Sequence, residues 1–388
     1  MISTSCASAW PHLKNGWMPW SQNLAAAGSA LQEDLENVNP DSFATALADE
    51  LSRRHDRFLT GLETYRSHPF HRDLPAPPAL WEAGPTRLLD YGATSPAGEA
   101  GRPVLVIPSL VNRSYILDLA KDHSFLRFLS SRGLRPLLID WGTPGREELG
   151  RSLGDYISGD MAAALDVAVG IADGEPVPVI GYCMGGTLAA ALAVLAPGKI
   201  SALILLAAPW DFHIGTNGPP IAVTAGRSGL EQLISTEGCL SVEALQSMFF
   251  SLDPLQGWTK FQTFAEVAAD SPAADRFVAL EDWLNDGVPL AAGVARECLF
   301  GWYGDNSPAG GIWEVCGQII DPAGIACQTL GIIPAQDRIV PPASAQALLD
   351  KIPDATSLSP QAGHIGMMAG RRAEAQLWKP LAEWIEAR

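Results

Sequence analysis

The stretch from Val177 to Ala196, VPVIGYCMGGTLAAALAVLA, decides the fold of this chain. An apolar run ends at Gly181, Cys183 follows two residues later, and a glycine pair then precedes a segment rich in Ala and Leu. A Gly-x-nucleophile-x-Gly pattern between a strand and a helix is typical of a nucleophile elbow, whose sharp turn exposes the side chain at its tip. Glycines beside the tip avoid Cβ clashes where the strand turns into the helix. We therefore predict that Cys183 is a nucleophile and that the N-terminus of the following helix favours its thiolate.

Backbone N–H groups near this elbow are expected to form an oxyanion hole. The N–H of Met184, the residue after the nucleophile, is expected to point at a developing oxyanion. The second donor is expected from the loop that follows the apolar run Val104–Ile107. In that loop Leu110 and Val111 are alternatives, between which the sequence does not choose.

Two later stretches supply partners for the nucleophile. LGIIPAQDRIVPP places Asp337 just after an apolar run, and SPQAGHIGMMAGRR places His364 in a glycine-flanked loop before the last helical stretch. Taken singly, Asp337 also fits a plain turn residue, and His364 a solvated loop histidine. Together they give the chain order nucleophile, acid, histidine, which is the order of α/β hydrolases. We predict a catalytic triad of Cys183, Asp337 and His364.

Apolar runs and helical stretches alternate on both sides of the elbow. Strands that are apolar throughout and separated by helices indicate a parallel sheet buried on both faces. The predicted strands are Val104–Ile107, Pro136–Asp140, Val177–Gly181, Ala202–Ala207 and Thr329–Ile333. The predicted helices between them are Tyr115–Arg132, Leu153–Asp173 and Thr187–Ala196. The sequence thus predicts an α/β-hydrolase fold with a mostly parallel, doubly wound sheet.

The alternation stops after Ala207 and resumes at Thr329. The residues between are too many for a loop, so we expect residues 211–326 to form an inserted cap domain. The cap is expected over the C-terminal ends of the strands, where ligands bind in open α/β sheets. Residues 85–210 and 327–388 are then expected to form the core.

Residues 1–84 are expected to form an N-terminal helical and extended segment. Apolar residues at helical spacing predict a helix that begins at Asp41 or Ser42 and continues through Tyr65. The proline-rich stretch Phe70–Pro85 is expected to be an extended connector.

The composition and net charge of the chain exclude several classes of function. The chain has 388 residues, of which 47% are hydrophobic, and a formal net charge of −17. This acidic balance argues against nucleic acid as a partner. The sequence shows no apolar run long enough to cross a membrane and no signal peptide, so we expect a cytoplasmic protein without a transmembrane segment. Six cysteines, none at zinc-ligand spacing, predict reduced thiols and no metal site.

Four ordered stretches, PSLVNRSYILDL, GYCMGG, QDRIVPP and GHIG, resemble motifs of the polyhydroxyalkanoate synthases, a family of the α/β-hydrolase superfamily. Upstream, YRSHPFHRDLPAPPALWEAGPTRLLDYG is similar to the short synthases that work with a second subunit. The resemblance implies that Cys183 carries the acyl group, that His364 is the base and that Asp337 is its partner.

The same resemblance implies an acyltransferase that polymerises (R)-3-hydroxyacyl-CoA into polyhydroxyalkanoate through an acyl thioester on Cys183. CoA thioester is then the substrate and CoA the product, with no cofactor. The implied partners are the polyester chain or granule surface, and granule association is expected with them. Self-association into a homodimer and the need for a second synthase subunit stay open.

Two other functions are compatible with these residues. A thioesterase or a polyester depolymerase would have the same triad and would differ only in admitting water. A non-catalytic granule-associated protein would keep the fold without turnover, although an intact triad argues against it. Incubation with 3-hydroxybutyryl-CoA separates these alternatives, because a synthase gives polymer and a hydrolase gives the free acid.

Overall fold

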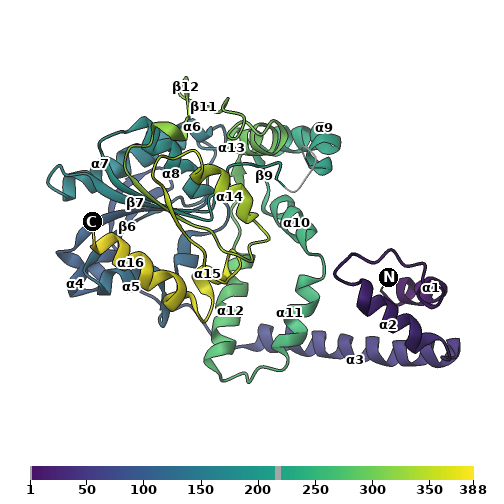
Figure 1. Cartoon of the computed structure of the whole chain (residues 1–388). Coiled ribbons are helices and arrows are strands. Elements are labelled where there is room, and N and C mark those ends of the chain that lie inside the picture. The colour runs from purple at the N-terminus through teal and green to yellow at the C-terminus, as the bar shows by residue number, and fades with distance from the viewer. Residues whose placement is uncertain (1, 215–219) are drawn as a thin grey trace. The chain divides into compact units, whose positions relative to one another are not determined.

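The computed structural model describes residues 2–214 and 220–388 (Figure 1). The chain divides into two compact units. One comprises Met1–Pro69 and Pro254–Val278, and the other comprises Phe70–Asp253 and Ala279–Arg388. Among the described residues, no helix combines the length and the apolar character needed to span a bilayer. Residue 1 and residues 215–219 of the expected cap lie outside the described residues.

The second unit is built on an eight-stranded sheet in the order β1-β2-β6-β3-β7-β8-β13-β14. Its strands are β1 (Ala79–Ala83), β2 (Thr86–Asp90), β3 (Arg102–Ile107), β6 (Leu134–Asp140), β7 (Val177–Tyr182), β8 (Ile200–Leu206), β13 (Gln328–Ile332) and β14 (Thr356–Leu358). β2 pairs antiparallel with both of its neighbours, β1 and β6, and the neighbours from β6 to β14 all pair parallel. The predicted α/β-hydrolase fold and its predicted parallel strands are confirmed.

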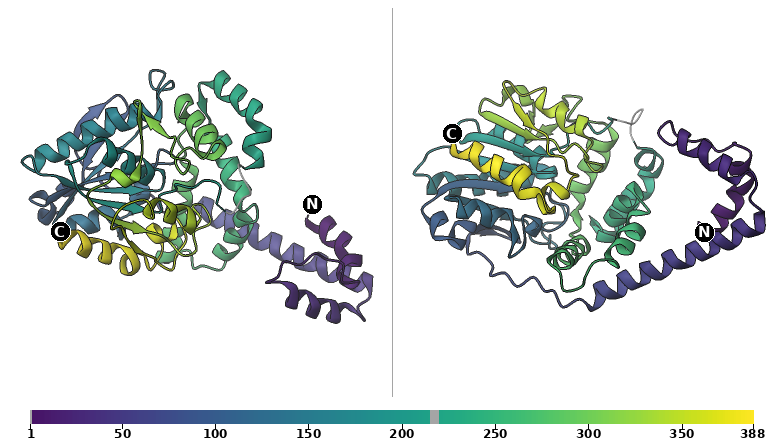
Figure 2. Two further views of the ribbon diagram at one scale, coloured as in Figure 1. Left: turned by 45° about the horizontal axis from the view of Figure 1, so that its top comes forward. Right: turned by 60° about the horizontal axis from the view of Figure 1, so that its bottom comes forward.

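Helices cover both faces of this sheet, as the two views in Figure 2 show. The residues of β3 alternate between two hydrophobic cores, with Leu105 and Ile107 in one core and Val104 and Val106 in the other. The first core lies under α7 (Ala162–Ile171), α8 (Met184–Leu195) and α14 (Pro342–Leu349). The second lies under α5 (Phe125–Ser131) and α16 (Lys379–Glu386). Strands buried on both faces explain why their sequences are apolar throughout.

The prediction of one helix over Tyr115–Arg132 is wrong. That stretch forms the short helical turn η2 (Ser114–Leu117), the strands β4 (Asp118–Ala120) and β5 (His123–Ser124), and then α5. Ser124 caps α5 by accepting a hydrogen bond from the Arg127 N–H, so the helix begins there. The fully buried Asp118 side chain accepts hydrogen bonds from Arg72, Arg127 and Tyr91. This ionic cluster fixes the irregular backbone that helical periodicity does not show.

Two other predicted boundaries are wrong. Residues 79–83 of the expected extended connector form β1, which joins β2 through Gly84 at φ +55°, so the sheet gains two antiparallel strands that the sequence analysis missed. The helix after the elbow begins at Met184 rather than Thr187. The predicted helix Leu153–Asp173 is present, with a π-helical turn, η3 (Tyr156–Met161), between α6 (Leu153–Asp155) and α7.

The first unit is helical. It contains α1 (Ile2–Lys14), α2 (Ala25–Leu35), α3 (Pro40–Ser67) and α11 (Gln256–Phe264). The Asn39 side chain accepts a hydrogen bond from the Asp41 N–H at 2.8 Å, so α3 begins before the expected Asp41 or Ser42. A Cβ at Gly61 would overlap the carbonyl oxygen of Phe261, which shows how closely α3 and α11 pack.

The segment expected to be a cap contributes to both units. Residues 254–278 belong to the first unit. In the second unit the segment forms α9 (Ile221–Glu237), β9 (Cys239–Leu240), α10 (Val242–Leu252), β10 (Leu290–Ala291), α13 (Ala292–Arg296), the π-helical η4 (Glu297–Gly304), β11 (Glu314–Val315) and β12 (Gln318–Ile319). The helix α12 (Pro272–Asn285) passes from one unit to the other.

Replacing Asp118 with Ala should destabilise the second unit by about 3 kcal/mol, because removing one partner of a buried ion pair leaves charge without compensation. Its carboxylate contacts both Arg72 and Arg127. The measurement is urea-induced unfolding of Asp118→Ala, with Asp122→Ala as the matched control, since Asp122 is an exposed turn residue four positions away. Equal midpoints for the two variants would contradict this account of the region.

Candidate active site

Cys183 occupies a strained turn between β7 and α8. Its backbone has φ 56° and ψ −127°, a conformation that costs a non-glycine residue of the order of 1–3 kcal/mol. The Cys183 N–H donates to the Leu206 carbonyl at 2.8 Å, and its carbonyl accepts from the Gly186 N–H at 2.8 Å. The neighbouring strand β8 and the first turn of α8 therefore hold the residue in this conformation. Its side chain is partly exposed, as a nucleophile requires.

The glycines around Cys183 allow neighbouring segments to pack closely against the elbow backbone. A Cβ at Gly181 would lie 2.5 Å from the Gly186 Cα, and one at Gly186 would lie 2.6 Å from the Ala208 Cβ. A Cβ at Gly185 would overlap the carbonyl oxygens of Ile107 and Pro108, at the end of β3. The elbow can therefore fit between the ends of β3 and β8 only where side chains are absent.

Asp337 and His364 meet beside the sheet. Asp337 follows β13, and His364 lies in the loop after β14. The His364 Nδ1 lies 2.7 Å from the Asp337 Oδ2, and the two side chains are 6% and 0% exposed. The other carboxylate oxygen, Oδ1, accepts from the Ile339 and Val340 N–H groups, both at 2.9 Å. Asp337 is thus fully hydrogen-bonded, and it orients the imidazole with its Nε2 edge free for another partner.

His364 interacts with Cys183 as well as with Asp337. Burial alone would lower the pKa of His364, but the negative charge of Cys183 and hydrogen bonds to Asp337 and Cys183 raise it to about 10. These interactions favour the imidazolium form of His364. The structure thus brings together the three side chains that the sequence analysis singled out.

Two tyrosines near Cys183 were not found from the sequence. The Tyr182 ring stacks on His364 with the centroids 5.3 Å apart, and burial raises the pKa of its phenol. Tyr303, in η4, lies close enough to Cys183 for the two side chains to interact electrostatically, and it is 40% exposed. Tyr182 adjoins the elbow in sequence, so its place was foreseeable. Tyr303 is distant in sequence, and nothing in the local pattern points to it.

The two candidates for the second oxyanion donor differ in their hydrogen bonds. The Val111 N–H donates to the Ser109 hydroxyl at 3.0 Å and is already engaged. Within residues 2–214 and 220–388, the Leu110 N–H has no hydrogen-bond acceptor. Met184 is the first residue of α8, where N–H groups lack intrahelical partners. The geometry favours Met184 and Leu110 over Val111.

The other cysteines have surroundings unlike those of Cys183. Cys239, Cys298, Cys316 and Cys327 are free thiols. Burial raises the pKa of Cys239, Cys298 and Cys327, which disfavours their thiolates. Among the residues that the structure describes, no three His, Cys, Asp or Glu side chains are grouped so that they could hold a metal ion.

The chain resembles known proteins of two kinds. Residues 102–227 match the family described as alpha/beta hydrolase fold. A carboxylesterase of Nitrososphaera gargenis shares the fold, with a TM-score of 0.51 and 13% identity over 80% of this chain and 99% of that chain.

Three curated relatives are each called "Poly(3-hydroxyalkanoate) polymerase subunit PhaC", and each is 29% identical to this chain. The relative from Haloferax mediterranei aligns with 80% of this chain and 63% of its own length. Those from Synechocystis sp. and Allochromatium vinosum each align with 74% of this chain, and with 78% and 81% of their own lengths.

Replacing Cys183 with Ala should lower the pKa of His364, because the charge and the hydrogen bond that raise it are lost. In the wild-type protein His364 should stay protonated up to about pH 10. Because this pKa is raised on folding, its contribution to stability is complete below the ordinary histidine pKa of about 6.5 and is lost as the pH rises towards 10. The measurement is an NMR titration of the imidazole nitrogens, with Cys316→Ala as the control. Identical titration curves for Cys183→Ala and wild type would contradict the ion pair.

Proposed function

We propose that the chain is an acyltransferase of the polyhydroxyalkanoate synthase family, which has the α/β-hydrolase fold, and that it polymerises (R)-3-hydroxyacyl-CoA. The observation that carries the proposal is Cys183 at a strained elbow, beside a His364 that is hydrogen-bonded to Asp337. A cysteine distinguishes this site from an esterase, in which an alkoxide forms the acyl-enzyme.

In the first step, the Cys183 thiolate attacks the thioester carbonyl of the substrate. The new bond joins its Sγ to the acyl carbon, and the bond from that carbon to the CoA sulfur breaks. The leaving CoA sulfur takes the proton from the His364 imidazolium, whose raised pKa keeps that proton in place until then. One thioester replaces another, so the step is close to thermoneutral and the acyl group stays activated.

In the second step, the 3-hydroxyl of another hydroxyacyl group attacks the thioester on Cys183. The neutral His364 takes the hydroxyl proton, an ester bond forms, and the cysteine leaves as a thiolate. Asp337 stabilises the imidazolium that results and keeps its orientation. The N–H groups of Met184 and Leu110 hold the oxyanion in both steps.

The alternative function, hydrolysis by a thioesterase or depolymerase, uses the same atoms with water in place of the hydroxyl. We propose that the parts of the inserted segment that belong to the second unit, residues 220–253 and 279–326, limit water at Cys183, which favours the alcohol. The relatives are named polymerase subunits, and this supports a second subunit as a partner of this chain. The polyester chain or granule surface, and a location in the cytoplasm or on granules, follow from the same proposal.

Butyryl-CoA separates the synthase from the hydrolase because it lacks the 3-hydroxyl that each elongation needs. Under the synthase proposal it acylates Cys183 once and stops, with CoA release near one equivalent per active site. 3-Hydroxybutyryl-CoA should instead give sustained CoA release and polymer. The measurement is thiol release against time for both substrates at matched concentration.

The control for this comparison is His364→Gln, which should slow sustained release from 3-hydroxybutyryl-CoA by roughly 10²–10⁴-fold through loss of the acid–base group. Sustained multiple turnover of butyryl-CoA by the wild-type protein, at a rate comparable to that of 3-hydroxybutyryl-CoA, would assign the chain to the hydrolases.

A further inference from the structure

Tyr303 is an exposed side chain on an otherwise buried turn of the inserted segment. It lies in the π-helical η4, where residues 298–300 and Trp302 are buried, whereas Tyr303 itself is 40% exposed. π-helical turns are frequently found at functional sites. The Tyr303 side chain also lies close enough to Cys183 for an electrostatic interaction. Its phenol is therefore a candidate for contact with an acyl group on Cys183.

Hydrogen bonds join this part of the chain to the loop that follows β8. The Phe212 N–H donates to the Asn306 Oδ1 at 2.9 Å, and the Asn306 Nδ2 donates to the Asp211 Oδ1 at 2.8 Å. The His213 Nε2 donates to the Tyr303 carbonyl at 3.0 Å, because a carbonyl can only accept. The Phe212 ring meets the Tyr303 ring edge to face, with the centroids 4.9 Å apart. These contacts hold both the backbone and the ring of Tyr303 against the loop.

The loop that holds Tyr303 starts beside the elbow. β8 is a neighbour of β7 in the sheet, and the Cys183 N–H donates to the carbonyl of Leu206, the last residue of β8. In the part of the chain that the structure describes, the Tyr303 hydroxyl has no hydrogen-bond partner, Cys183 included. The Tyr182 hydroxyl, by contrast, donates to the His364 carbonyl at 3.4 Å. Of these two tyrosines, Tyr303 is thus the one whose hydroxyl is available to a substrate.

An acyl group on Cys183 would bring an oxygen within reach of this hydroxyl. In a 3-hydroxyacyl thioester the oxygen on C3 lies roughly 4–5 Å from the sulfur, because C1, C2 and C3 separate the two atoms. A side chain that is near Cys183 without bonding to it suits a partner at that distance. A phenol is protonated at neutral pH and can donate one hydrogen bond, which a hydroxyl oxygen can accept.

We propose that the Tyr303 phenol donates a hydrogen bond to the oxygen on C3 of the acyl group that Cys183 carries. Tyr303 is then a further catalytic residue, and it recognises the 3-hydroxyl when Cys183 is acylated, before that hydroxyl is needed for elongation. The inference rests on the proposed acyl transfer to Cys183. It predicts that an acyl group without an oxygen on C3 gains nothing from Tyr303.

The test is the variant Tyr303→Phe, which keeps the ring and removes only the hydroxyl. The second-order rate constant for acylation of Cys183 is measured from the first equivalent of CoA released, with 3-hydroxybutyryl-CoA and with butyryl-CoA. The ratio of the first constant to the second should fall about 3–10-fold in Tyr303→Phe, the range expected for one hydrogen bond between neutral groups. The constant for butyryl-CoA should equal that of the wild-type protein.

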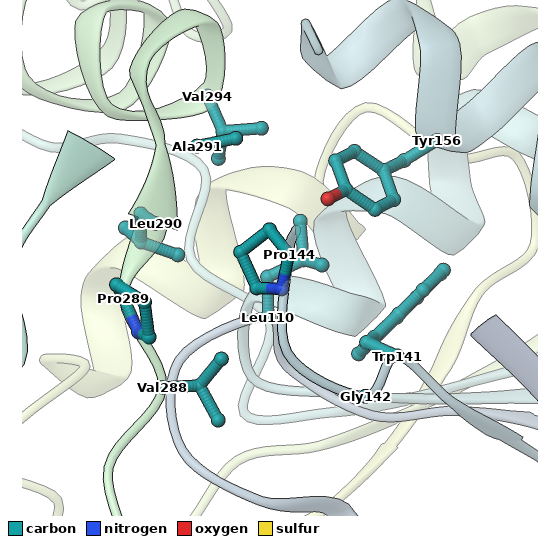
Figure 3. Close-up of a pocket in the computed structure, with 10 residues that line it drawn as sticks. All are labelled: Leu110, Trp141, Gly142, Pro144, Tyr156, Val288, Pro289, Leu290, Ala291 and Val294. Carbon is teal, nitrogen blue, oxygen red and sulfur yellow. The ribbon is translucent and has the colours of Figure 1, made fainter. Parts of the chain in front are cut away.

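Tyr156→Phe is the matched control for this substitution. Tyr156 lines a small apolar hollow together with Trp141 and Leu290 (Figure 3). None of the triad residues is among the described residues that line this hollow. The ratio of the two acylation constants in Tyr156→Phe should therefore equal that of the wild-type protein.

Thermal unfolding provides a second measurement on Tyr303→Phe. Its midpoint should match that of the wild-type protein, because the hydroxyl bonds to no other residue of the described chain. A lowered midpoint would mean that the hydroxyl is held within the protein, and this would overturn the inference.

Two kinetic results would also overturn the inference while leaving the proposed function intact. One is an unchanged ratio of acylation constants in Tyr303→Phe. The other is a fall by the same factor for both substrates, which a merely structural role of Tyr303 would produce. A wild-type protein that is acylated by neither substrate would count against the proposed function itself.

Discussion

The contact of Gly185 with the carbonyl oxygens of Ile107 and Pro108 is the constraint on which the rest of the site depends. It brings the first turn of α8 against the end of β3, so that the elbow packs directly against the loop that follows β3. The same approach leaves no room for a side chain at Gly185. Cys183 then has to turn through a positive φ to connect β7 with α8. Backbone strain at Cys183 is thus a consequence of packing around it.

Asp337 and His364 come from strands on the opposite side of β7 from β3. β13 and β14 pair in parallel next to β8, so their C-terminal ends lie at the same edge as that of β7. Asp337 is fixed there by two backbone N–H groups and in turn fixes His364. The sheet therefore supplies all three side chains from loops at one edge, as open α/β sheets do for their ligands. Charge on Cys183 then decides whether His364 keeps its proton.

The sequence predicts the parallel strands and the order Cys183, Asp337, His364, because both leave local signals. Apolar runs mark buried strands, and glycines mark the elbow. The stretch Tyr115–Arg132 escapes such reasoning, since the buried Asp118 joins residues that are far apart in sequence. The edge strand at residues 79–83 was also not predicted, because the proline-rich residues before it indicate an extended connector. Tyr303 is brought near the elbow only by tertiary packing.

The central claim is that the acyl group is carried by Cys183 as a thioester, and the most direct measurement locates that group. The protein is mixed with 3-hydroxybutyryl-CoA, quenched in acid and digested, and the peptides are mapped by mass. The account predicts that the acyl mass lies on the peptide containing Cys183, that it is removed by hydroxylamine, and that it is absent from Cys183→Ala but retained in Cys316→Ala. An acyl mass on the peptides containing Cys239 or Cys316, with none on that containing Cys183, would contradict it.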